Sequence, residues 1–229
     1  PGLVSNLTAF AEDHTSVLVT WFLPVRINGL ITKFAVKVKH ARTGQTVRTL
    51  ELNAEDIMNG ALPHCNDAAD ILSRGTPSPS ESSQLTSAVL PTVTLSAVPP
   101  AFIWSVAISV KIDELRPYTP YVFEVSAFTS DGEGQIASTM VRMPEAAPED
   151  PPQSVVFRNI TSKSLSLSWD PPKITTGRFS YVIQLHSSEG FISENSTIEQ
   201  AFMYTGLTPY TQYYIHVMAK SAGATGPAA

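Results

Sequence analysis

The sequence predicts an all-β chain made of two tandem β-sandwiches, and three observations support this fold class. The pattern Leu-x-Pro-x-Thr-x-Tyr occurs at residues 115–121 and again at residues 207–213. Each copy leads into a segment in which apolar and mostly polar residues alternate, as expected of a half-buried strand. An alternating segment that ends in tryptophan lies upstream of each copy, at residues 17–21 and 165–169. Two copies of one arrangement indicate two similar domains.

The aromatic residues of this arrangement have a structural interpretation. Tyr121 and Tyr213 stand at the start of their strands, where a tyrosine corner places the ring in the core and the hydroxyl against the backbone just upstream. Trp21 and Trp169 end the earlier strands and are expected in the two cores. We therefore interpret these four residues as a structural signature.

A third alternating segment completes the resemblance to a known family. Residues 34–38 and 181–185 alternate in the same way, which favours antiparallel sheets with one solvated face. The combination of a Trp on the second strand, an aromatic on the third, the repeated pattern before the sixth and no intersheet cysteines resembles the fibronectin type III family. The resemblance covers nearly the whole chain and implies two immunoglobulin-like β-sandwiches.

The domains are expected at residues 1–146 and 147–229, separated by a proline-rich linker at residues 143–153. Prolines favour an extended, stiff backbone, so the linker suits a spacer, although an ordinary connector is equally compatible with it. The chain reaches its last residues, 226–229, where the last strand of a sandwich would begin. The seventh strand of the second domain is therefore expected to be truncated, with an unpaired sheet edge.

The first domain is expected to carry a long insertion at about residues 51–100, between its middle strands. Trp21 and Tyr121 are 100 positions apart, whereas Trp169 and Tyr213 are 44 apart. Residues 104–112 alternate as a strand, so the additional residues must precede them. Capped helix starts are indicated at Asn53 and Asp67, mobility in the Pro/Ser-rich residues 76–83, and an extra edge strand at residues 92–95.

Three acceptor motifs for N-linked glycans begin at Asn6, Asn159 and Asn195. They favour a secreted or cell-surface chain, while chance occurrence in a Ser/Thr-rich sequence stays an alternative. The net charge of −5 includes no basic stripe, so nucleic acid is not expected as a partner. No run of about 18 apolar residues could span a bilayer, so a membrane would be reached only through other parts of a longer chain.

Cys65 is the only cysteine, so no disulfide can form within the chain. We expect a free thiol and a monomer, with a Cys65-linked dimer as the alternative. His64 and Cys65 begin like the tyrosine phosphatase signature His-Cys-x5-Arg, but Ile71 stands where that signature has Arg. A nucleophilic role for this cysteine is therefore not supported.

No catalytic, cofactor-binding or metal-ligating set is indicated elsewhere, and no cofactor is expected. The nucleophile elbow, the zinc-protease motif and the phosphate-binding loop are all missing from the sequence. His186 and His216 fall on solvent-facing strand positions without further ligands in the pattern. The acidic pairs at residues 12–13, 113–114 and 149–150 are interpreted as solvated charges, not calcium ligands.

Within the family, the sequence of residues 148–155 and 159–172 resembles the repeats of receptor-type tyrosine phosphatases with many repeats. This resemblance implies a non-catalytic stalk on the extracellular side of the plasma membrane, with protein partners or neighbouring repeats. For the member that it most resembles, it implies sensory hair-bundle stereocilia. The alternatives are an adhesion or ligand-binding unit that uses the insertion, and an intracellular scaffold, which the three acceptor motifs disfavour.

Overall fold

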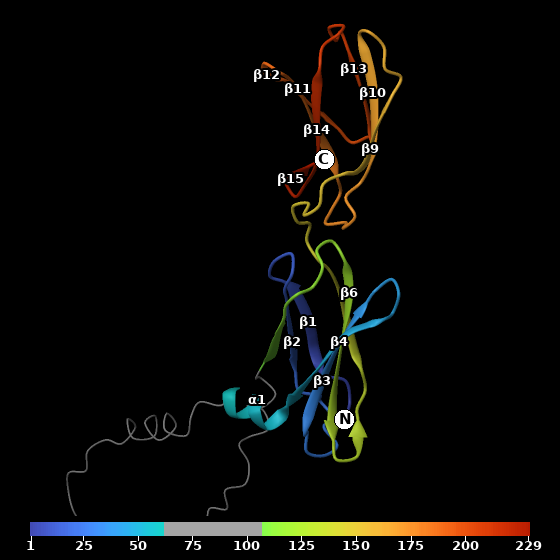
Figure 1. Cartoon of the computed structure of the whole chain (residues 1–229). Coiled ribbons are helices and arrows are strands. Elements are labelled where there is room, and N and C mark those ends of the chain that lie inside the picture. Colours follow the sequence, from blue (N-terminus) through green and yellow to red (C-terminus); the bar gives the residue numbers. More distant parts are fainter. Residues whose placement is uncertain (62–106) are drawn as a thin grey trace, which may run out of the picture. The chain divides into compact units, whose positions relative to one another are not determined.

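The computed structural model describes residues 1–61 and 107–229, which form two β-sandwiches and one short helix (Figure 1). All paired strands whose register is given are antiparallel, and the all-β prediction is confirmed. Strands β1 to β8 build the first sandwich and strands β9 to β15 the second.

The first sandwich consists of two facing sheets. One has the strand order β1 (Ser5–Ala11), β2 (Val17–Phe22), β5 (Ile108–Ile112). The other has the order β4 (Thr46–Asn53), β3 (Lys33–His40), β6 (Pro120–Thr129), β7 (Gly132–Glu133), with β8 (Ala137–Arg142) also paired to β6. The alternation seen in the sequence places one face of each strand in a common core, where the rings of Trp21 and Phe34 lie 5.7 Å apart.

The second sandwich repeats this plan. Its smaller sheet has the order β13 (Ala201–Thr205), β10 (Ser164–Asp170), β9 (Gln153–Arg158), and its larger sheet has the order β12 (Gly190–Thr197), β11 (Ser180–Ser187), β14 (Tyr213–Ser221), β15 (Ala224–Ala228). Trp169 packs edge-on against Tyr181 in a core of its own, with Ile183, Leu185 and Val217. β8 ends just before the predicted linker, and β9 begins at its last residue, Gln153.

The expected truncation of the last strand is wrong for residues 224–228. β15 pairs with β14 through Ser221 and Ala224, Lys220 and Thr225, and Met218 and Ala228. The sequence pattern concealed this strand because Gly226 and Pro227 are poor strand residues. A register shift between Met218 and Lys220 accommodates them.

The insertion begins later than residue 51. Glu51 and Leu52 pair with Ala35 and Phe34, so β4 continues to Asn53. Helix α1 (Ala54–Ala61) then starts where the sequence predicts a capped helix, with the Asn53 Oδ1 accepting a hydrogen bond from the Glu55 amide at 3.0 Å. The expected second helix at Asp67, the mobile residues 76–83, the strand at 92–95 and the beginning of the strand at 104–112 lie outside the described residues.

Candidate interaction surfaces and glycosylation sites

The two pattern tyrosines make the same hydrogen bond. The Arg116 amide donates to the hydroxyl of Tyr121 at 3.1 Å, and the Thr208 amide donates to the hydroxyl of Tyr213 at 3.0 Å. Because an accepted N–H stabilises the phenolate, this contact lowers the pKa of Tyr213. The geometry is that of a tyrosine corner, so the structural role assigned to these residues agrees with their placement.

The three glycosylation candidates differ in accessibility. Asn6 on β1 and Asn159 after β9 are exposed and have positive φ angles of 47° and 49°. Asn195 on β12 is half-buried, and its side chain hydrogen bonds to the hydroxyl of the buried Tyr204. Asn195 is therefore the least accessible of the three, and the geometry favours Asn6 and Asn159 as acceptors.

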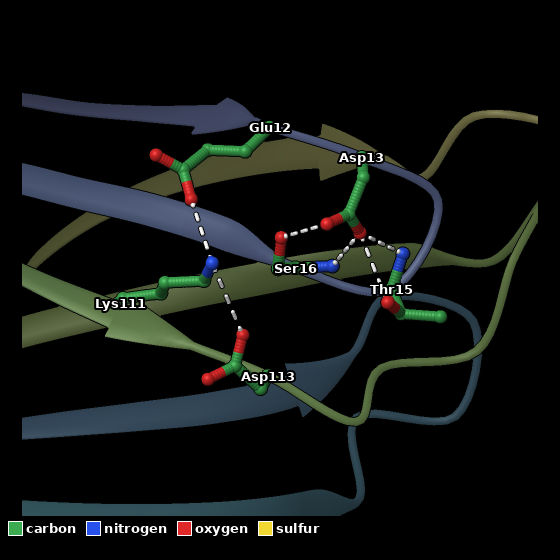
Figure 2. A network of polar contacts seen from close by, with 6 residues as sticks. All are labelled: Glu12, Asp13, Thr15, Ser16, Lys111 and Asp113. Atoms are coloured by element: carbon green, nitrogen blue, oxygen red, sulfur yellow. Dashed lines mark hydrogen bonds and ion pairs between the residues drawn. The ribbon is translucent and has the colours of Figure 1, made fainter.

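Asp13 organises the turn between β1 and β2, as Figure 2 shows. Its Oδ1 accepts the amides of Thr15 and Ser16, each at 2.7 Å, and the hydroxyl of Thr15 at 2.9 Å. Its Oδ2 accepts the Ser16 hydroxyl at 2.7 Å. These donors, led by the Ser16 hydroxyl, hold the pKa of Asp13 well below its ordinary value. The carboxylate is thus satisfied by its own turn.

Two acidic pairs from the sequence meet beside this turn. The Lys111 Nζ lies 3.2 Å from a carboxylate oxygen of Glu12 and 3.7 Å from one of Asp113 (Figure 2). These carboxylates raise the pKa of Lys111, mainly through the Glu12 hydrogen bond. Glu12 and Asp113 therefore share the Lys111 ammonium group as an ion-pair partner. Over residues 1–61 and 107–229, no group of three or more His, Cys, Asp or Glu could hold a metal ion.

A groove of about 1010 Å³ opens beside the start of α1. Its walls come from the end of β2, the loop before β3, and the junction of β4 with α1, and include Leu23, Leu30, Phe34, Asn53 and Ala54. Leu30, one of the lining residues, is 85% exposed. No sequence pattern indicates this groove, because its lining residues come from separate segments.

Two further placements bear on the sequence predictions. The rings of His186 and His216, from different strands of the second sandwich, lie 4.9 Å apart. Cys65 lies outside the described residues, so the free thiol stays a prediction. Within residues 1–61 and 107–229, no helical segment has the length and hydropathy of a membrane span.

Comparison with known proteins gives relatives for both sandwiches. Residues 150–229 match the fibronectin type III domain family. The chain is 44% identical to phosphatidylinositol phosphatase PTPRQ of Rattus norvegicus and 43% identical to that of Homo sapiens, over 99% of this chain and 10% of each relative. Netrin receptor DCC of Rattus norvegicus is 25% identical over 99% of this chain and 12% of that protein.

The chain therefore spans about a tenth of the length of the two PTPRQ relatives. The two sandwiches, their tyrosine corners and the family match all point to fibronectin type III repeats. Residues 150–229 belong to the fibronectin type III family, and the whole chain, as two tandem sandwiches, resembles part of a receptor-type phosphatase with many such repeats.

Proposed function

We propose that this chain is a non-catalytic extracellular module of a receptor phosphatase, which spaces the receptor and contacts protein partners or neighbouring repeats. The observation that carries the proposal is the 43–44% identity to PTPRQ along 99% of the chain. The same similarity favours the cell surface, and sensory hair-bundle stereocilia, as the location. In the described residues, the polar networks stabilise turns or lie along the faces of strands, as expected of a structural repeat.

A spacer requires length and stiffness but no particular surface. The test is to replace this chain within the full receptor by two unrelated sandwiches joined by a linker of equal length. A spacer predicts unchanged delivery to the cell surface and unchanged receptor behaviour. Loss of behaviour with normal surface delivery would contradict the spacer role and indicate a specific binding surface instead.

Specific ligand binding is the second candidate, and the groove beside α1 favours it. Leu30→Glu would place a charge in the groove, while Val25→Glu changes a similarly exposed residue of the same loop that does not line it. If the groove binds a ligand, purified chain carrying Leu30→Glu should lose binding to receptor-expressing tissue and the Val25→Glu control should keep it. Deletion of residues 62–106 tests whether the insertion contributes.

Location has a direct test. The chain should be secreted from mammalian cells with a signal peptide, and its intact mass measured before and after enzymatic removal of N-linked glycans. Glycan mass at Asn6 and Asn159 supports the extracellular module. Secretion without glycosylation, or retention in the cell, would favour the intracellular scaffold. A dimer that is seen on a non-reducing gel and lost on reduction would assign intermolecular pairing to Cys65.

A further inference from the structure

The outer face of the β12-β11-β14 sheet brings two histidines together. In the register of β11 with β14, His186 lies opposite Tyr214 and Gln184 lies opposite His216. His186 and His216 therefore occupy diagonal positions on neighbouring strands. His186 is two residues from Gln184, the partner of His216, so both histidines project from the same face of the sheet. Their ring centres are 4.9 Å apart with an angle of 47° between the ring planes.

We propose that His186 and His216 form a surface site for a borderline divalent transition metal ion, of which Zn²⁺ and Cu²⁺ are the representatives. Imidazole nitrogens are preferred ligands of these ions. Two imidazoles bound to one Zn²⁺ at about 2.0–2.1 Å in a tetrahedral arrangement place their ring centres roughly 5 Å apart. The observed separation of 4.9 Å agrees with this spacing.

A chain of side chains on the same face fixes the tautomer of His186. The Gln184 Nε2 donates to the Glu194 Oε2 at 2.8 Å, which turns the amide oxygen of Gln184 away from Glu194. That oxygen lies 3.4 Å from the His186 Nε2, so the ring nitrogen is the donor. The lone pair of His186 is then on Nδ1. Histidines that bind metals commonly donate their other N–H to such a partner.

The surroundings leave the site open to solvent. His216 is exposed, and His186 is half-buried with its ring edge-on to Phe191 at 5.5 Å. Glu194 is the acidic side chain tied to this arrangement, through Gln184. In residues 1–61 and 107–229, no third His, Cys, Asp or Glu completes a ligand group here. The remaining coordination positions would therefore be filled by water or by a ligand group of a bound partner.

The test uses the full 229-residue chain with Cys65→Ser, which removes the thiol as a competing ligand. ZnCl₂ is titrated while the imidazole nitrogens are followed by NMR, and CuCl₂ is used separately for electron paramagnetic resonance. The expected result is that His186 and His216 shift together at one metal concentration and return on addition of chelator. The copper spectrum should show coupling to two nitrogens, and the exposed His14 should not shift with them.

Variants distinguish a two-histidine chelate from independent weak binding. His186→Gln and His216→Gln should each abolish the joint response, and the double variant should lose no more than either single one. Gln184→Leu should weaken binding by about tenfold through loss of orientation, and His14→Gln should have no effect. Circular dichroism and cooperative unfolding verify that every variant is folded.

The proposal is overturned if folded His186→Gln leaves the response of His216 unchanged, or if the two rings titrate at different metal concentrations. It is equally overturned if neither ring responds to Zn²⁺ or Cu²⁺, in which case the two rings are only stacked. All of these results concern metal binding to the second sandwich, so they leave the proposed spacer role to its own experiments.

Discussion

Tyr121 and Tyr213 make the same backbone hydrogen bond from different degrees of burial. Tyr121 is 2% exposed, whereas Tyr213 is half-buried. The Arg116–Tyr121 hydrogen bond is part-buried and the Thr208–Tyr213 hydrogen bond is exposed, so water replaces the lost acceptor more readily in the second repeat. The same chemical change should therefore have unequal effects in the two repeats.

Tyr121→Phe is expected to reduce the free energy of unfolding of the first sandwich by about 1 kcal/mol, because the Arg116 amide loses its acceptor. Tyr213→Phe should give a smaller loss in the second sandwich. Urea unfolding of both variants measures the difference. An equal or larger loss for Tyr213→Phe would show that the corner does not depend on burial.

Asp13 makes the stability of the first sandwich dependent on acid. Its pKa in the folded chain lies below its ordinary value of 3.8, so its contribution is complete above that pH and is lost as the pH falls through the folded pKa. Asp13→Asn should lower stability at neutral pH and flatten the decline in acid. Melting temperatures from pH 7 to pH 2 check this, with Asp131→Asn as an exposed control. Parallel acid limbs for wild type and Asp13→Asn would contradict it.

At the scale of single residues, the tyrosine corners could be predicted from the sequence, but the histidine pair could not. Leu-x-Pro-x-Thr-x-Tyr contains the whole local geometry within seven residues, including the positive φ angles of Tyr118 and Tyr210 at its centre. His186 and His216 are brought together only by strand register, which no short pattern specifies. The groove beside α1 escaped prediction for the same reason.

Each sandwich has a glycine packed against its first residues, Gly134 just after β7 and Gly226 on β15. A Cβ on Gly134 would lie 2.6 Å from the carbonyl oxygen of Pro1, and one on Gly226 would lie 2.7 Å from that of Pro148. Real Cβ atoms do not approach backbone so closely, and backbone cannot move aside as a flexible side chain can. Both positions therefore require glycine, the residue without a Cβ atom.

Gly226→Ala is expected to destabilise the second sandwich by about 1–3 kcal/mol, as overpacking does in a filled interior. Thr225→Ala, exposed on the same strand, should change stability by less than about 0.5 kcal/mol. Urea unfolding measured through the second sandwich compares the two. A Gly226→Ala variant as stable as the wild type would show that β15 can shift without cost.

The strands that alternate over five or more residues were predictable, because burial of one face imposes a period of two. β15 was not, since Gly226 and Pro227 hide the period. The start of α1 was visible in Asn53 and the acidic residues after it. The predicted onset of the insertion was early because residues 51–53 continue β4, which polar side chains on its outer face obscured.

On the scale of the whole molecule, the second repeat should fold alone. Its core residues form one cluster from its own strands, and the family match covers residues 150–229. A fragment of residues 147–229 is expected to unfold cooperatively and to give a dispersed amide spectrum by NMR. A collapsed spectrum without a cooperative transition would show that this repeat requires the rest of the chain.

The two core tryptophans also make the repeats distinguishable by fluorescence. Trp21 and Trp169 are 0% and 3% exposed, and within the described residues neither indole N–H has a hydrogen-bond partner. An indole in such dry, apolar surroundings emits at shorter wavelength than one in water. Changing Trp104, the third tryptophan of the chain, to Phe and then one core Trp to Phe would leave a single emitter. Each repeat thus contains its own fluorophore. In a variant with one tryptophan, strain or unfolding of that repeat can be followed without tryptophan emission from the other repeat.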